Sequence, residues 1–164
     1  MRFAYLVNKN KYIINDIEAI VYSSHNMQAI IDIMLDLMCY KKFNLKELGL
    51  VRKIAWKVQE MARIGNWIST WEREINEDDF TSGIFALALE NKIINFDRLK
   101  KEDKIKIINK IKKAKIKEKF LKQWLENYRF IKKLSLKIKS INFKKFFSGL
   151  EKLIFFHLAS KGYK

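Results

Sequence analysis

The sequence contains no proline, only five glycines and one cysteine in 164 residues. Proline breaks helices and glycine permits turns, so their scarcity favours long helices joined by short polar connections. The single Cys39 excludes an intrachain disulfide framework and a zinc site built from cysteines. Because Cys39 lies in the apolar run IMLDLMCY, we expect a buried, inert thiol, and a reducing cytoplasm as the location.

Long apolar runs are also absent. No segment approaches the ~18 apolar residues that a membrane-spanning helix requires. The start, MRFAYLVNKNKYIIND, is interrupted too soon to predict a signal peptide. A length of 164 residues with 49% hydrophobic residues is typical of one folded domain rather than a disordered chain. We therefore expect a single domain over residues 1–164.

Helical periodicity dominates what is present. Apolar residues recur with a period near 3.6 from residue 45 onward, and the stripe on residues 45–75 includes small residues that permit close helix approach. Asn44 with Glu47 resembles a capping box, and Ser23 or Ser24 and Thr81 or Ser82 are further candidate caps. The expected fold is an all-α helical bundle, with helices over residues 12–22, 26–41, 45–75, 82–92, 100–120, 121–139 and 143–160.

Positive charge is concentrated in the C-terminal part of the chain. The net charge is +16, and residues 101–164 carry 20 Lys and Arg against 5 Asp and Glu, whereas residues 1–100 carry 14 against 13. The excess is consistent with an anionic partner, with an acidic subunit contact, or with the Ile-, Lys- and Asn-rich composition that an AT-rich coding sequence produces. The lysine–isoleucine tract at residues 100–120 suits an amphipathic helix on anionic lipid. Its isoleucines argue against base stacking, so nucleic acid is not the expected partner.

A ladder of oxygen-bearing side chains marks the segment RIGNWISTWEREINEDDF at residues 63–80. Asn66, Thr70 and Glu74 are spaced four residues apart, and each step turns a helix by ~400°, so the three side chains share one side. An amide oxygen, a hydroxyl and a carboxylate are hard ligands that suit Mg²⁺. Arg73 lies beside the ladder, and Gly65 removes side-chain bulk next to it. We expect a magnesium site here.

This ladder resembles the second metal-binding motif of class I terpene synthases. In that family an Asn or Asp is followed four residues later by Ser or Thr and eight later by Glu, with a basic residue before the Glu that contacts diphosphate. The run NWISTWERE matches at Asn66, Thr70, Arg73 and Glu74, and departs at Trp67, where the family usually has an acidic residue.

The C-terminus is similar to the last helix of the same family and the Arg–Tyr pair that follows it. Tyr163 matches the tyrosine, and Lys161 or Lys164 stands where the arginine would be. The resemblance implies the C-terminal half of the class I terpenoid synthase fold. It also implies Mg²⁺ at Asn66, Thr70 and Glu74, and an isoprenoid diphosphate held by Arg73, Tyr163 and Lys161.

The resemblance covers only half of the family's domain. Its aspartate-rich motif is missing, Asp32 and Asp36 are too close in sequence to replace it, and IEAIVYSSH near residue 20 lacks the arginine that senses diphosphate. Metal-triggered loss of diphosphate and carbocation cyclisation, a lyase reaction, would therefore require a second chain that supplies the aspartates. We expect this chain alone to be inactive.

Structural interpretations stand beside these functional ones. Asn66 and Thr70 would satisfy each other and nearby backbone while Glu74 pairs with a basic neighbour. Asp32 and Asp36 would form a solvated edge of a buried helix. His25 would be a cap or surface residue and His157 a core or interface residue, and a set of aromatic residues would belong to the core, namely Trp67, Trp71, Trp124, Phe155 and Phe156. The whole chain would then be a non-enzymatic basic module that binds an anionic membrane, nucleic acid or protein.

Overall fold

The computed structural model describes residues 2–95 and 103–160, and these form α-helices and short 3-10 turns without any strand. The predicted all-α class is therefore confirmed. Within these ranges no helix has the length and apolar character needed to cross a membrane. The helices are α1 (Arg2–Lys9), α2 (Asp16–Ser24), α3 (Ala29–Cys39), α4 (Leu48–Asn76), α5 (Gly83–Glu90), α7 (Lys104–Lys113), α8 (Ile116–Ser135) and α9 (Lys144–Ala159).

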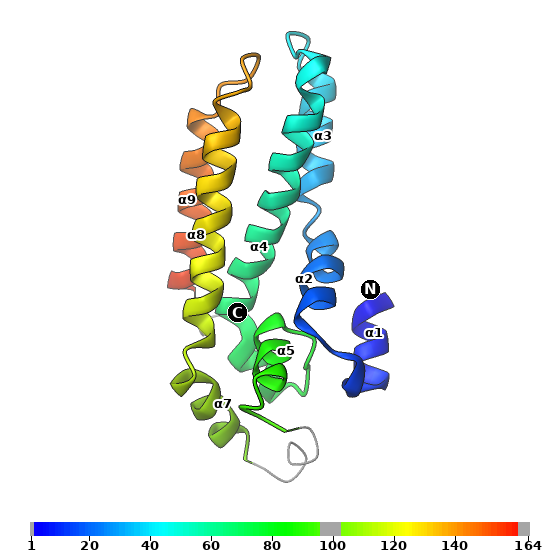
Figure 1. Ribbon diagram of the computed structural model, residues 1–164, viewed down its shortest axis with the longest axis vertical. Helices are drawn as coiled ribbons and strands as arrows, with labels where there is room; N and C mark the ends of the chain where they lie inside the picture. The colour runs from blue at the N-terminus through cyan, green and yellow to red at the C-terminus, as the bar shows by residue number, and fades with distance from the viewer. Residues whose placement is uncertain (1, 96–102, 161–164) are drawn as a thin grey trace.

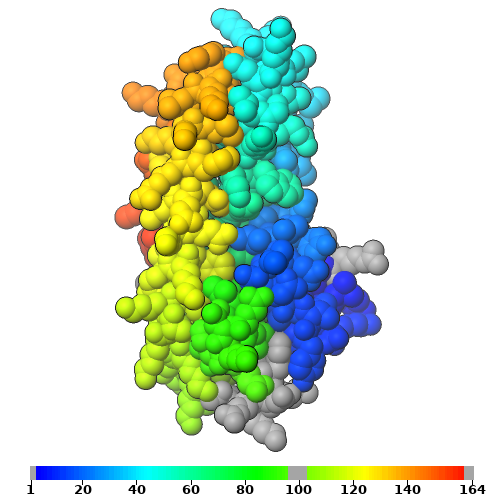
Figure 2. All heavy atoms as spheres, viewed as in Figure 1, coloured from blue at the N-terminus to red at the C-terminus, as the bar shows by residue number. Residues whose placement is uncertain are grey.

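The central element is α4, a 29-residue helix that contacts α2, α3, α5, α7, α8 and α9. Figure 1 shows α8 and α9 along one side of α4 and α2 and α3 along the other. At one end of the bundle, Figure 2 shows α5 between α2 and the α7–α8 side. The predicted apolar stripe of α4 is confirmed, since its large members are at most 5% exposed, namely Val51, Ile54, Val58 and Met61.

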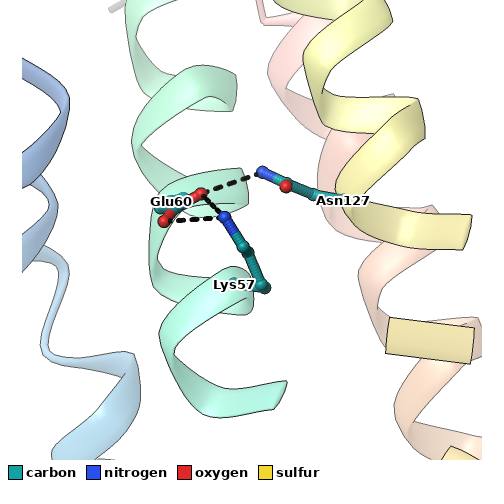
Figure 3. Close-up of polar contacts among 3 residues, drawn as sticks. All are labelled: Lys57, Glu60 and Asn127. Carbon is teal, nitrogen blue, oxygen red and sulfur yellow. Dashed lines mark hydrogen bonds and ion pairs between the residues drawn. The ribbon is translucent and has the colours of Figure 1, made fainter. Parts of the chain in front are cut away.

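A polar cluster fixes α8 against the middle of α4. Glu60, whose side chain is 14% exposed, accepts hydrogen bonds through Oε2 from Lys57 Nζ at 2.8 Å and from Asn127 Nδ2 at 3.1 Å (Figure 3). Asn127 comes from α8 and is itself buried. A half-buried carboxylate with a cation and an amide donor is satisfied rather than orphaned, so this cluster has a structural role.

Gly65 gives α9 its close approach to α4. A Cβ at Gly65 would lie 2.8 Å from Nδ1 of His157 on α9. The prediction that small residues on α4 admit a neighbouring helix is confirmed at this position. The predicted role of His157 at an interface between helices is confirmed by the same contact.

The region from residue 23 to residue 40 differs from the prediction. Neither Ser23 nor Ser24 caps α3; instead Gln28 precedes that helix with a left-handed φ of 57°. The predicted buried helix is wrong, because α3 contains no fully buried residue. The predicted buried thiol is also wrong, since Cys39 is exposed. The apolar composition of α3 is real, but half of its surface has no neighbour among the described residues.

The lysine-rich segment contains a break that the periodicity does not show. α7 ends at Lys113, and Lys115 has a left-handed φ of 52° before α8 begins at Ile116. The predicted boundary at residue 120 is therefore wrong by several residues. Ile107 and Ile111 of α7 are each 1% exposed, so they belong to the core and leave the lysines as a solvated face.

Glu47 ties the start of α4 to the α8–α9 connection. It does not reach back to Asn44 as a capping box would; its Oε1 accepts from Lys139 N at 2.8 Å and its Oε2 from Ser140 Oγ at 2.5 Å. The hydrogen bond from the Ser140 hydroxyl, with that from the Lys139 amide, lowers the pKa of Glu47 below its ordinary value of 4.5.

We expect Glu47→Gln to lower the free energy of unfolding at neutral pH. A carboxylate with a lowered folded-state pKa stabilises the protein above 4.5 and loses this contribution as the pH falls through the folded-state pKa. The difference between variant and wild type should thus shrink in acid, as measured by urea unfolding at several pH values. Glu118→Gln, at an exposed position on α8, is the control and should show no such pH dependence.

Candidate metal and diphosphate site

The predicted ladder lies in the last three turns of α4, beside a turn that folds back on the helix. Asp78 adopts a left-handed φ of 58°, and the Asp79 amide donates to the Glu74 carbonyl at 2.8 Å. Such a left-handed residue after a helix satisfies the terminal carbonyls. The helix ends where the sequence predicted, at Asn76. The reversal brings the acidic stretch after α4 back toward Glu74.

Hydrogen bonds connect all three ladder residues. The Thr70 hydroxyl has two acceptors in reach of its single proton, Glu74 Oε1 at 2.6 Å and the Asn66 carbonyl at 2.8 Å. The Asn66 Oδ1 accepts from Nη1 of Arg63 at 3.1 Å. Thr70 is 3% exposed, so its hydroxyl is held in place by these partners. The structural interpretation of Asn66 and Thr70 thus fits in part, but Glu74 forms no ion pair with any residue that the structure describes.

Arg63 is a site residue that the sequence interpretation missed. Its Nε donates to the Ser23 carbonyl at the end of α2, at 2.9 Å. Burial lowers the pKa of Arg63, and the nearby Glu74 carboxylate raises it; an arginine remains charged in any case. The segment near residue 20 has no arginine of its own, and Arg63 of α4 contacts the end of this segment at Ser23. Its spacing of seven residues before Thr70 and eleven before Glu74 was the available signal.

Glu74 is the least satisfied group in the site. Its Oε2 is buried and has no hydrogen-bond partner among the described residues. Burial raises the pKa of Glu74, and the Asp79 carboxylate adds to this, while the Thr70 hydroxyl, Arg73 and Arg63 act in the opposite direction. Two carboxylates that repel each other and one orphaned oxygen form a location where a cation would be favoured.

Asp79 is the second carboxylate, and it is held rigidly. Its Oδ1 accepts from the Thr81 amide at 3.0 Å and from the Thr81 hydroxyl at 2.8 Å. The sequence interpretation treated NEDDF as a helix end and assigned no role to Asp79. The sequence does not reveal the left-handed turn at Asp78. This turn places Asp79, rather than another acidic residue of the stretch, near Glu74.

These groups line a small cavity of about 130 Å³. It lies between the end of α4, the turn after it, α1 and the junction of α2 with the following 3-10 turn. The lining contains one guanidinium, two carboxylates, a phenol, an amide and two hydroxyls. The residues are Phe3, Ala4, Tyr22, Ser23, Asn26, Arg63, Trp67, Glu74, Asp79 and Thr81.

Of the predicted diphosphate ligands, Arg73 is the one that the structure describes, and it does not line this cavity. Arg73 is exposed, and its Nε forms an ion pair with Glu77 Oε1 at 3.4 Å. Tyr163, Lys161 and Lys164 lie outside the described residues. Among the residues that line the cavity, Arg63 is the cation, while Arg73 acts on Glu74 from outside the lining.

Trp67, the departure from the family pattern, packs between α4 and α5. It is 2% exposed, stands edge-to-face on Phe120 at 5.4 Å and lies against the backbone of Gly83. The predicted core role of Trp67 is confirmed, as it is for Trp71 and Trp124, at 3% and 6% exposure.

The other residues considered from the sequence lie away from the cavity. Asp32 and Asp36 are exposed on α3. His25 stacks edge-to-face on Trp56 at 4.8 Å, which fits a surface residue. The predicted core location of Phe155 and Phe156 is wrong, because they are 70% and 64% exposed on α9.

The donor set fits a hard cation that keeps part of its own water. Residues 2–95 and 103–160 contain no group of three or more His, Cys, Asp or Glu side chains able to hold a metal. Two carboxylates with neutral oxygens nearby match Mg²⁺, which is commonly bound through one or two carboxylates, waters and substrate phosphate. Glu74 Oε2 and the Asp79 carboxylate are the atoms that would hold it.

No model of a known protein family, no curated protein and no solved structure matches this chain.

Proposed function

We propose that this chain binds Mg²⁺ together with the diphosphate end of an isoprenoid, at the cavity beside the end of α4. The observation that carries the proposal is the buried Glu74 Oε2, which lacks a partner and lies near a second carboxylate. A carboxylate buried in this way costs free energy unless a cation or donor meets it. A divalent ion bridging to a diphosphate would supply that partner.

Five residues at or beside the cavity have a role in this proposal. Glu74 and Asp79 hold the metal, and Thr70 positions Glu74 through the bond at 2.6 Å. Arg63 offers its guanidinium to diphosphate oxygens, and Asn66 orients Arg63 through the bond at 3.1 Å. Bound Mg²⁺ would neutralise charge on the diphosphate and so favour its departure.

The isoprenoid part of the substrate rests on the sequence resemblance. The cavity of about 130 Å³ has the volume of roughly four waters, which suits a metal and a phosphate group but not a hydrocarbon chain. The hydrocarbon would require surface from another element. We therefore retain the proposal that a second chain with an aspartate-rich motif completes a terpene synthase-like enzyme.

An apolar surface is available for that second chain. The outer face of α2 and α3 exposes large apolar side chains that no described element covers, namely Ile17 (70%), Ile31 (56%), Leu35 (55%) and Met38 (83%). Exposed apolar side chains of this kind commonly mark a protein interface. Of these two helices, α2 also borders the cavity, so a partner bound here would lie near the site.

Calorimetry with inorganic pyrophosphate as the probe tests this proposal. We expect pyrophosphate to bind the full chain in the presence of Mg²⁺ and not in the presence of EDTA. Asp79→Asn keeps the oxygen that accepts from Thr81 but loses the charge, and should weaken binding by about a hundredfold. Thr70→Val, which releases Glu74, should weaken it by about tenfold.

Asp36→Asn is the matched control, since Asp36 is an exposed carboxylate on α3. It should bind as the wild type does. Equal affinities for wild type, Asp79→Asn and Asp36→Asn would mean that pyrophosphate binds to the general positive charge of the chain. That result would remove the basis of the proposal.

A further inference from the structure

The inner face of the last helix, α9, packs against the rest of the bundle. Leu150 is 7% exposed, and Phe147 stands edge-to-face on Tyr128 of α8 at 5.7 Å. Glu151, the acidic residue of α9, accepts a hydrogen bond from the Tyr128 hydroxyl. The carboxylate of α9 is therefore directed toward α8.

The outer face of α9 combines cations with exposed aromatic rings. Lys144 and Lys145 in the first turn and Lys152 in the middle of the helix are exposed, and near its C-terminal end Phe155 is 70% and Phe156 is 64% exposed. Lys152 lies three and four residues before the two rings, so the three side chains are neighbours on the helix surface. Leu153 and Leu158, about 40% exposed, border this face. Glu151, which is also exposed, lies four residues before Phe155 at the edge of this face, where it is hydrogen-bonded to Tyr128 of α8.

This face differs from the lysine-rich surface of α7. On α7 the isoleucines Ile107 and Ile111 are buried, and the exposed side chains include lysines and one isoleucine, Ile105, but no aromatic ring. Lysines alone give weak, screened attraction to any anion. On α9, phenylalanine rings accompany the lysines, and Figure 1 shows this helix beside α8, on the side of the bundle away from α3.

We propose that the outer face of α9 docks on an anionic lipid bilayer. Phenylalanine rings have no polar atom and gain free energy at the boundary between headgroups and acyl chains. Lysine stems extend so that the ammonium groups reach lipid phosphates. A face with three cations, one carboxylate that is hydrogen-bonded at its edge, and two exposed rings has a net positive charge and an apolar area that suit this surface. This inference is independent of the metal site.

Sedimentation of the full chain with lipid vesicles tests this proposal. We expect binding to phosphatidylcholine vesicles that contain phosphatidylglycerol, and little binding to phosphatidylcholine alone. Changing Phe155 and Phe156 together to alanine should reduce partitioning by about tenfold or more. Changing Lys144, Lys145 and Lys152 to glutamine should reduce it by about a hundredfold and weaken its salt dependence.

Matched variants on α7 separate this face from the general charge of the chain. Lys106 and Lys113 are exposed, and Ile105 is 65% exposed. Changing both lysines to glutamine, or Ile105 to alanine, should leave vesicle binding within about twofold of wild type. Equal losses from the α7 and α9 variants would overturn the proposal.

Two further results would also overturn it. One is stronger competition by RNA than by the vesicles for the same α9 residues. The other is a dimer in solution that becomes monomeric when Phe155 and Phe156 are alanine, because the face would then be a contact between copies. Circular dichroism melts of each variant establish that the fold is retained.

Discussion

Gly83→Ala is expected to lower the free energy of unfolding by about 3 kcal/mol. A Cβ at Gly83 would lie 2.4 Å from Cζ3 and 2.5 Å from Cη2 of the Trp67 ring. The ring is 2% exposed and packs edge-to-face on Phe120, so it cannot move toward α8 without a clash. The first turn of α5 would have to move away from α4. In a thermal melt the midpoint should fall by about 6–12 °C.

Gly149→Ala is the matched control for this substitution. Nothing lies within 4 Å of a Cβ at Gly149, which is exposed within α9. Alanine is there expected to stabilise the helix by up to about 1 kcal/mol. Adding Trp67→Phe to Gly83→Ala should recover part of the lost stability, because the smaller ring frees the space. A loss below about 1 kcal/mol for Gly83→Ala would contradict this packing.

Glu74→Gln is expected to raise the free energy of unfolding without Mg²⁺ and to lower it, relative to wild type, with Mg²⁺. Burial and the neighbouring Asp79 raise the pKa of Glu74, so its charged form opposes folding. The carboxyl therefore stabilises the protein below 4.5, and this contribution is lost as the pH rises through the raised folded-state pKa. A glutamine, which is neutral at pH 7, should raise the free energy of unfolding by about 1 kcal/mol in EDTA.

In Mg²⁺ the wild type should have a higher free energy of unfolding than Glu74→Gln. At about ten times the dissociation constant, the metal should stabilise the wild type by about 1.4 kcal/mol, and Glu74→Gln should gain almost nothing. Glu77→Gln is the control, because Glu77 is 59% exposed and lies one residue beyond the end of the same helix. It should keep the full Mg²⁺ effect. An equal Mg²⁺ effect in Glu74→Gln would show that the metal binds elsewhere.

The helical class and the core of α4 follow directly from the sequence. The apolar period of 3.6 places Ile54 and Met61 on one stripe, and both are 1% exposed. The Ser82 cap also follows, since its side chain accepts from the Ile84 amide. These features depend on residues close together in the chain, where local propensity and burial agree.

Features that depend on the presence of neighbours were not predictable. The apolar α3 and the aromatic end of α9 look like core segments, yet Met38 is 83% and Phe155 is 70% exposed. Periodicity reports which face is apolar but not whether another element covers it. Similarly, the left-handed residues Gln28 and Lys115 interrupt helical patterns without a glycine or proline to mark them.

The ladder of Asn66, Thr70 and Glu74 was predictable from the sequence, but the residues that line the cavity together with Glu74 were not. The spacing of Thr70 and Glu74 placed both side chains on one side of α4, and the hydrogen bond between them agrees with this placement although the sequence analysis did not predict it. Arg63 was overlooked because its partner, the Ser23 carbonyl, lies 40 residues away. Asp79 reaches the cavity through the turn at Asp78, and acidic composition alone does not specify such a turn.

A crystal structure of the chain with Mn²⁺ and inorganic pyrophosphate tests the central claim most directly. Mn²⁺ takes the same carboxylate ligands as Mg²⁺ and gives an anomalous signal. We predict a peak bound by Glu74 Oε2 and the Asp79 carboxylate at about 2.1 Å, with the pyrophosphate between it and Arg63. An anomalous peak elsewhere, with Glu74 Oε2 still unbound, would contradict the assignment of this cavity.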